Sequence, residues 1–157
     1  MTDADERLAR MGIVLPEVLP PVARAYAPAF EPFVRSGNLI HISGRLAKNG
    51  EDILSGKIGP DLTQEEGREA ARNVAIELLS VLKHAAGGLD RVSRIVKLFA
   101  MVNGAPGFDQ PHKIADGASE LLVQVLGEPG RHARSAMVAA ELPFGSCLEI
   151  DLVAEVL

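Results

Sequence analysis

The stretch ARSAMVAAELPFGSCLEIDLVAEVL (133–157) contains two apolar segments separated by the turn ELPFGS (141–146). In the second segment Leu148, Ile150 and Leu152 alternate with more polar residues. This period of two is typical of a β-strand with one buried face. The first segment is small or apolar on both faces, apart from one arginine. The pattern predicts two C-terminal strands joined by a short loop.

Arg134 is the residue that does not fit its strand, because its neighbours are alanine, serine, methionine and valine. A guanidinium among such side chains must be paired or must reach water. One interpretation is an anion anchor, since guanidinium binds a carboxylate through two parallel hydrogen bonds. The other is a structural ion pair, for instance with Asp151 or with a neighbouring chain. The residue pattern alone favours the ion pair, just as it favours a merely solvated Glu149.

If the last two strands form a hairpin, the length of the loop between them predicts which residues lie opposite each other. If the six-residue loop pairs them, Arg134 lies opposite Val153 and Val138 lies opposite Glu149. Arg134 and Glu149 would then share a face at a separation of roughly 13 Å. A joint role would need a ligand that spans this distance, or a second subunit that supplies one of the two side chains.

The remaining elements predict an α+β fold. Thr63 and Glu66 form a capping box before a helix that Gly87 and Gly88 end. A second helix begins near 109–111. Strands are expected over VRSGNLIHISGRL (34–46, as a hairpin) and RVSRIVKLFAMV (91–102), and a short charged helix over DADERLARM (3–11). We therefore expect a five- to six-stranded mixed sheet with two long helices on one face.

Both faces of the inner strands are largely apolar. In the strand 94–102 both the odd and the even positions carry mainly apolar side chains, and the strand 133–140 is similar. Two helices cover only one face of such a sheet, so the second apolar face needs another partner. The sequence therefore predicts a homo-oligomer that buries this face between subunits.

The composition excludes several classes of protein. A chain of 157 residues that is 47% hydrophobic suits one domain with a substantial core. A net charge of -5, no basic run and 4% aromatic residues argue against nucleic-acid binding. One cysteine and four histidines without ligand spacing predict no metal site, and we expect no cofactor. The polar N-terminus and the lack of a long apolar run favour a cytoplasmic protein without a membrane segment.

Three stretches, in the correct order, resemble the Rid/YjgF family. ARSAMVAAELPFGSCLEIDLVAEV is similar to the family's C-terminal signature, through Ala133-Arg134-Ser135, Leu142-Pro143 and Leu148-Glu149-Ile150-Asp151. HISGRL (41–46) resembles its SGQ strand, and TQEEGREAARNVAIELLSVLKHAAGGLDRVSRIVKL (63–98) resembles its helix-to-strand stretch. The likeness covers residues 30–157 and leaves 1–29 as an N-terminal helix and extended arm. Some members were long regarded as L-PSP endoribonucleases or translation inhibitors.

The resemblance implies a chorismate-mutase-like fold and a homotrimer with clefts between its subunits. The characterised branch hydrolyses reactive enamines and imines, such as 2-aminoacrylate and 2-iminopropanoate, to 2-oxo acids and ammonia. By resemblance Arg134 holds the substrate carboxylate and Glu149 positions the attacking water. The other substrate-binding positions are Ser135, Ala136 through its backbone, Gly44, which leaves room for close approach, Phe33 and His112.

The sequence departs from that branch in its cleft. Phe33 stands where the family has a tyrosine, Ala136 replaces a cysteine, and His112 falls on an asparagine position. A lone histidine near a helix start is more often a surface residue than an acid–base group, and Cys147 is expected to be a packed residue. Three hypotheses remain: an imine hydrolase acting on a small carboxylate-bearing molecule, a non-catalytic trimer that binds a 2-oxo acid, and, least favoured, a ribonuclease.

Overall fold

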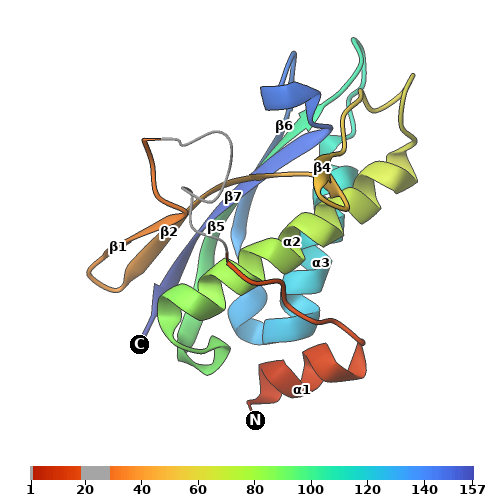
Figure 1. Ribbon diagram of the computed structural model, residues 1–157. Coiled ribbons are helices and arrows are strands. Elements are labelled where there is room, and N and C mark those ends of the chain that lie inside the picture. The colour runs from red at the N-terminus through yellow and green to blue at the C-terminus, as the bar shows by residue number, and fades with distance from the viewer. Residues whose placement is uncertain (1, 19–28) are drawn as a thin grey trace.

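Figure 1 shows the computed structural model of the chain, in which residues 2–18 and 29–157 are described. Helices and strands follow one another in this order: α1 (Asp3–Arg10), β1 (Phe33–Ser36), β2 (Leu39–Leu46), β3 (Lys48–Asn49), β4 (Asp52–Ile53), α2 (Gln64–Ala86), β5 (Val92–Asn103), α3 (Pro111–Leu126), β6 (Ala133–Ala139) and β7 (Leu148–Val156). Single 3-10 turns lie at Leu89–Arg91, Glu128–Gly130 and Pro143–Gly145. The predicted order of elements is confirmed.

One five-stranded sheet, in the order β1-β2-β7-β5-β6, forms the centre of the described structure. All neighbours in it are antiparallel except β5 and β6, so the sheet is mixed. Helices α2 and α3 lie side by side across one face of the sheet, as Figure 1 shows. Strands β3 and β4 form a separate small ribbon. The expected α+β arrangement, with two long helices on one face, is confirmed.

Helix α2 has the start and the end that its sequence predicts. The Thr63 hydroxyl accepts a hydrogen bond from the Glu66 amide, and the Glu66 carboxylate accepts one from the Thr63 amide. Gly87 ends the helix in the left-handed conformation, at φ 81°. An apolar stripe of this helix faces the sheet, and Ala71, Val74, Ala75, Leu78 and Leu82 are buried there. Capping and amphipathic period therefore act together to place α2 on the sheet.

The predicted hairpin between β6 and β7 is wrong. β5 lies between these two strands and pairs with both of them, in parallel with β6 and antiparallel with β7. The reason is α3, which connects β5 to β6. A helical crossover returns the chain in the same direction, so β6 takes the free edge of β5 as a parallel neighbour. The loop after β6 then carries the chain past the end of β5 to its other edge.

This topology places Arg134 and Glu149 on opposite faces of the sheet. Arg134 is the register partner of Leu98, which is fully buried beneath the helices. Glu149 is the register partner of Met101, three residues further along β5. Because side chains alternate between faces along a strand, an odd offset puts the two on different sides. The expectation that they share a face is therefore wrong.

No described helix covers the second face of the sheet. Most of its side chains are half-buried or exposed, and they include Val34, Leu39, His41, Lys97, Phe99, Met101, Ser135, Met137, Glu149, Asp151, Val153 and Glu155. We call this surface the open face. Met137 is 49% exposed there, although its side chain is apolar. The predicted second apolar face is thus present and is interrupted by carboxylates.

The N-terminal helix packs onto the main body of the chain. Ala4 and Leu8 of α1 are buried in the same core as the long helices. Asp5 forms an ion pair with Lys83 of α2, and that ammonium lowers the pKa of the Asp5 carboxyl. Beyond α1, the Pro16 carbonyl accepts a hydrogen bond from Ser80. The rest of the predicted arm, residues 19–28, lies outside the described residues.

Within residues 2–18 and 29–157, none of the helices has the length and apolar character needed to cross a membrane.

Cys147 lies in the core, immediately before β7, with no exposed surface. Burial raises the pKa of its thiol to about 11. Since the thiolate is the reactive form, the native protein should react with iodoacetamide at pH 8 far more slowly than the unfolded protein. The measurement is the alkylation rate in buffer and in guanidinium chloride, followed by mass spectrometry. Equal rates in the two solutions would show that Cys147 is accessible and reactive.

Candidate functional site

Arg134 lies at the edge of the sheet, between β6 and helix α3. Its Nη1 donates to Asp116 Oδ1 at 2.8 Å and to Ser119 Oγ at 3.1 Å, and its Nη2 donates to the His112 carbonyl at 3.3 Å. All three acceptors belong to α3. The side chain remains 23% exposed. The expected partner Asp151 is wrong, because that residue lies on the open face, and the ion pair is made with Asp116 instead.

A second set of hydrogen bonds extends from Arg134 through Ser119. Ser119 Oγ lies 2.9 Å from His132 Nε2, and His132 Nδ1 lies 2.7 Å from the Gly130 carbonyl. A carbonyl oxygen only accepts, so we assign the imidazole proton to Nδ1 and an acceptor role to Nε2. Ser119 then donates to His132 and accepts from Arg134. One tautomer satisfies all of these contacts.

His132 is kept neutral by its surroundings. Burial lowers the pKa of its imidazole, the hydrogen bond to Gly130 opposes this shift, and the positive charge of Arg134 lowers the pKa further. A neutral His132 adds no positive charge beside Arg134, and it fixes the direction of the Ser119 hydroxyl. The guanidinium therefore lies against α3, where it donates to acceptors from three successive turns of the helix.

Glu149 occupies the open face beside the start of the β2 bulge. A Cβ on Gly44 would lie only 2.8 Å from Glu149 Oε2, so the glycine makes room for the carboxylate. The β2–β7 register shifts between Ile42 and Arg45, which brings Gly44 to this position. Among the described residues, none forms a hydrogen bond or ion pair with the Glu149 carboxylate. Burial, and then repulsion from Asp151, raise the pKa of Glu149.

The other predicted site residues are distributed over both faces. Ser135 lies on the open face, where its hydroxyl accepts a hydrogen bond from Lys97 at 3.0 Å. Ala136 shares the helix face with Arg134. The ring of Phe33 meets the His84 imidazole edge to face, with centroids 5.9 Å apart. His112 is exposed and contributes its backbone carbonyl to Arg134, rather than its imidazole.

Within one chain, the predicted site residues therefore form two separate groups. Arg134 lies with His112 and near Ala136, whereas Glu149 lies with Gly44. The residues that hold Arg134, namely Asp116, Ser119 and His132, were not singled out as site residues from the sequence. The usable signal was the spacing of Asp116 and Ser119, three residues apart on one face of a predicted helix.

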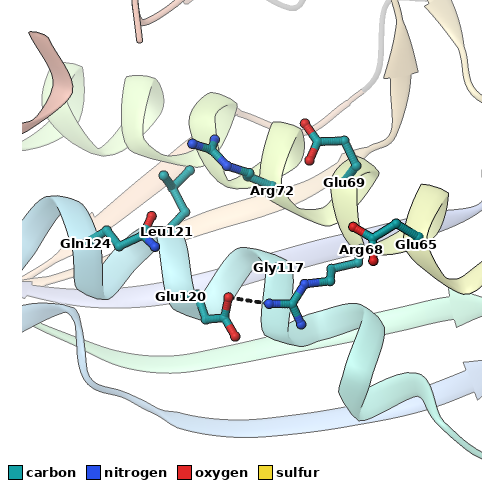
Figure 2. A pocket seen from close by; sticks show the side chains of 8 residues that line it. All are labelled: Glu65, Arg68, Glu69, Arg72, Gly117, Glu120, Leu121 and Gln124. Carbon is teal, nitrogen blue, oxygen red and sulfur yellow. Dashed lines mark hydrogen bonds and ion pairs between the residues drawn. The ribbon is translucent and has the colours of Figure 1, made fainter. Parts of the chain in front are cut away.

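Two shallow cavities accompany the long helices, and neither contains Arg134 or Glu149. The first, about 200 Å³, lies between α2 and α3 and is shown in Figure 2. Arg68 is paired with Glu120 across it. The second, about 180 Å³, lies beside Pro16 and includes Arg45, Lys48 and Glu77. Lys48 and Glu77 are 3.3 Å apart.

No candidate metal site is found in the part of the chain that the structure describes. Within residues 2–18 and 29–157, the side chains of histidine, cysteine, aspartate and glutamate form no group of three or more that could hold an ion.

Comparison with known proteins identifies relatives over nearly the whole chain. Residues 5–156 match the family model described as "YjgF/chorismate mutase-like, putative endoribonuclease". Protein TCP17 of Trypanosoma cruzi is 43% identical over 150 residues, which are 94% of this chain and 91% of that protein.

Solved structures show the same fold. A protein of unknown function from Agrobacterium tumefaciens is 36% identical, with a TM-score of 0.85 over 98% of this chain and 94% of that one. A Shewanella oneidensis protein, described as a "putative endoribonuclease", is 31% identical, with a TM-score of 0.89 over 99% and 100%. RidA from an Antarctic Psychrobacter, 22% identical with a TM-score of 0.52 over 90% and 99%, shares the fold. The chain has the chorismate-mutase-like α+β fold and belongs to the YjgF/chorismate mutase-like family.

Proposed function

We propose that this protein is an enamine/imine hydrolase that binds a small carboxylate-bearing substrate in clefts between the subunits of a homotrimer. The observation that carries the proposal is the position of Arg134 and Glu149. Both are partly exposed and lie on neighbouring regions of the sheet, but they point to opposite faces. A single chain cannot direct both at one small molecule. A cleft in which one subunit supplies Arg134 and the next supplies Glu149 can do so.

The open face supplies the reason to assemble. It is a broad surface of mixed apolar and charged side chains that no described helix covers, and the apolar side chains of Met137 and Val34 are 49% and 56% exposed there. Such a surface on a chain of this size is typical of a subunit interface. Closed cyclic assembly would bury it and would bring the edge of one sheet, with Arg134, against the face of the next.

The proposed chemistry needs little beyond positioning and one proton-transfer group. Arg134 binds the carboxylate of a 2-imino acid. Glu149 accepts a proton from a water molecule as its oxygen adds to the imine carbon. The nitrogen takes up one proton from solvent, which makes it an amino group in the adduct, and a second proton that Glu149 returns to it. It then leaves as ammonia, while the hydroxyl group of the adduct loses its proton to solvent and becomes the carbonyl of a 2-oxo acid. An enamine enters the same path after it has tautomerised to the imine. Because the imine is already reactive, orientation supplies much of the rate.

A second candidate function is the binding of a 2-oxo acid without turnover. Phe33 favours it, since its ring packs against His84 and offers no hydroxyl group to the cleft. Tight binding of pyruvate without release of ammonia from an imine would select this candidate. A ribonuclease activity, as in the descriptions of some relatives, is opposed by the net charge of -5. Support for it would require RNA cleavage that persists when Arg134 and Glu149 are replaced.

Replacement of the anchor should remove most of the activity. Arg134→Met loses a charge-assisted hydrogen-bonding pair, and we expect kcat/KM for ammonia release from freshly generated 2-aminoacrylate to fall about 10- to 100-fold. Arg134→Lys should restore only part of it, because lysine lacks the planar fork. Arg131→Met is the matched control, since Arg131 is exposed and paired with Glu128. An unchanged rate in Arg134→Met would exclude the anchor.

The activity should also depend on pH through Glu149. Only its carboxylate accepts a proton, and its pKa is raised above the ordinary 4.5. As the pH falls through this raised value, the carboxylate is protonated and kcat/KM should decline. The midpoint of this decline on the acid side should lie above pH 4.5. Asp151→Asn removes the repulsion that contributes to the shift, and the decline should move to lower pH.

Glu155→Gln on the same strand serves as the control for Asp151→Asn. It changes the charge by the same amount and should leave the pH profile where it is. A decline in activity that stays in place in Asp151→Asn, or that persists in Glu149→Gln, would contradict the assignment of Glu149.

A further inference from the structure

Arg134 already carries a counter-ion in the absence of any ligand. Asp116 Oδ1 lies 2.8 Å from its Nη1, and the Asp116 side chain is 39% exposed. The pair is therefore close to neutral as a unit, although it stands at the proposed carboxylate anchor. A ligand that binds there meets an arginine and an aspartate together, and both determine what it must look like.

The hydrogen bonds of Arg134 leave part of the guanidinium for a ligand. An arginine side chain has five N–H groups. Two on Nη1 go to Asp116 and Ser119, and one on Nη2 goes to the His112 carbonyl. Within the described residues, Nε–H and the second Nη2–H have no acceptor. These two N–H groups are the donors that Arg134 retains for a carboxylate.

Asp116 likewise retains capacity. Its Oδ1 accepts from Arg134, whereas no described residue donates to its Oδ2. Arg68 exerts a weaker electrostatic attraction on it, but the Arg68 guanidinium is paired with Glu120, which is the main reason that the pKa of Arg68 is raised. Asp116 Oδ2 is therefore an acceptor and a negative charge close to the ligand site.

We propose that Asp116 is a specificity-determining residue that makes the Arg134 site prefer zwitterionic ligands, with a carboxylate and an adjacent cationic nitrogen, over simple carboxylates. A plain carboxylate gains the two N–H groups of Arg134 but is repelled by Asp116. An α-amino or α-iminium acid gains the same hydrogen bonds, and Asp116 attracts its positive nitrogen. The inference rests on the proposed function, because it takes Arg134 as the carboxylate anchor.

This preference has a consequence for the proposed reaction. The substrate is zwitterionic when its imine nitrogen is protonated, and this is the form that water attacks most readily. The 2-oxo acid product has lost the nitrogen and keeps only the carboxylate. Asp116 therefore favours the reactive form of the substrate and weakens binding of the product, which helps the product to leave.

The test uses two probes that differ only in the cationic group, alanine and propionate, with the full-length protein at pH 7. Calorimetry or ligand-observed NMR gives Kd for each. Wild type should bind alanine more tightly. In Asp116→Asn propionate should bind more tightly and alanine more weakly, so that the ratio of the two Kd values changes by about fivefold or more. Asp116→Ser, a second neutral replacement, should change the ratio in the same direction.

Glu120→Gln is the matched control, since Glu120 lies on the same helix, loses the same charge and is paired with Arg68 on the side facing α2. It should leave the ratio unchanged. If Arg134→Met weakens both probes but neither Asp116 variant alters their ratio, this inference is wrong and the anchor stands. If Arg134→Met affects neither probe, the proposed function fails first and the inference with it. Weaker propionate binding in both Asp116 variants would also overturn the inference, because it would show a structural role.

Discussion

The parallel pairing of β6 with β5 is the constraint on which the rest of the site depends. Helix α3 joins these strands, and a helical crossover returns the chain in the same direction. The same helix then lies over β6 and supplies each acceptor that Arg134 uses. Because β6 is held at one edge of β5, β7 occupies the other edge, and its carboxylates face away from the helices. One connection thus places both halves of the candidate site.

The two halves differ in their electrostatics. Arg134 is surrounded by acceptors, so its charge is compensated and its orientation is fixed before a ligand arrives. Glu149 is half-buried on the open face, and burial and the nearby Asp151 raise its pKa. Arg134 thus carries its own counter-ion, Asp116, whereas no described residue pairs with the Glu149 carboxylate. A cyclic assembly that brings the edge of one subunit to the open face of the next would combine them without rearranging either.

Local patterns were sufficient to predict the helices and strands. They were not sufficient to predict which strands lie next to one another in the sheet. The capping box at Thr63 and Glu66, the stop at Gly87 and the alternation in β7 depend on residues close in sequence, and all appear as expected. The β6–β7 hairpin was wrong because strand pairing depends on the crossover through α3. Asp116 and Ser119 of α3 were missed for the same reason, since a helix reveals its polar face but not the strand beneath it. The family signature located Arg134 and Glu149, but it did not show that they face opposite sides.

The central claim, that Arg134 and Glu149 act on one ligand from two chains, has a direct test. Chains carrying Arg134→Met and chains carrying Glu149→Gln are co-expressed with different affinity tags, and doubly tagged oligomers are isolated. Each variant alone should be nearly inactive in ammonia release from 2-aminoacrylate. The mixed oligomer should regain activity, because some clefts then combine an intact Arg134 with an intact Glu149. Mixed oligomers as inactive as either parent would contradict a site that is shared between subunits.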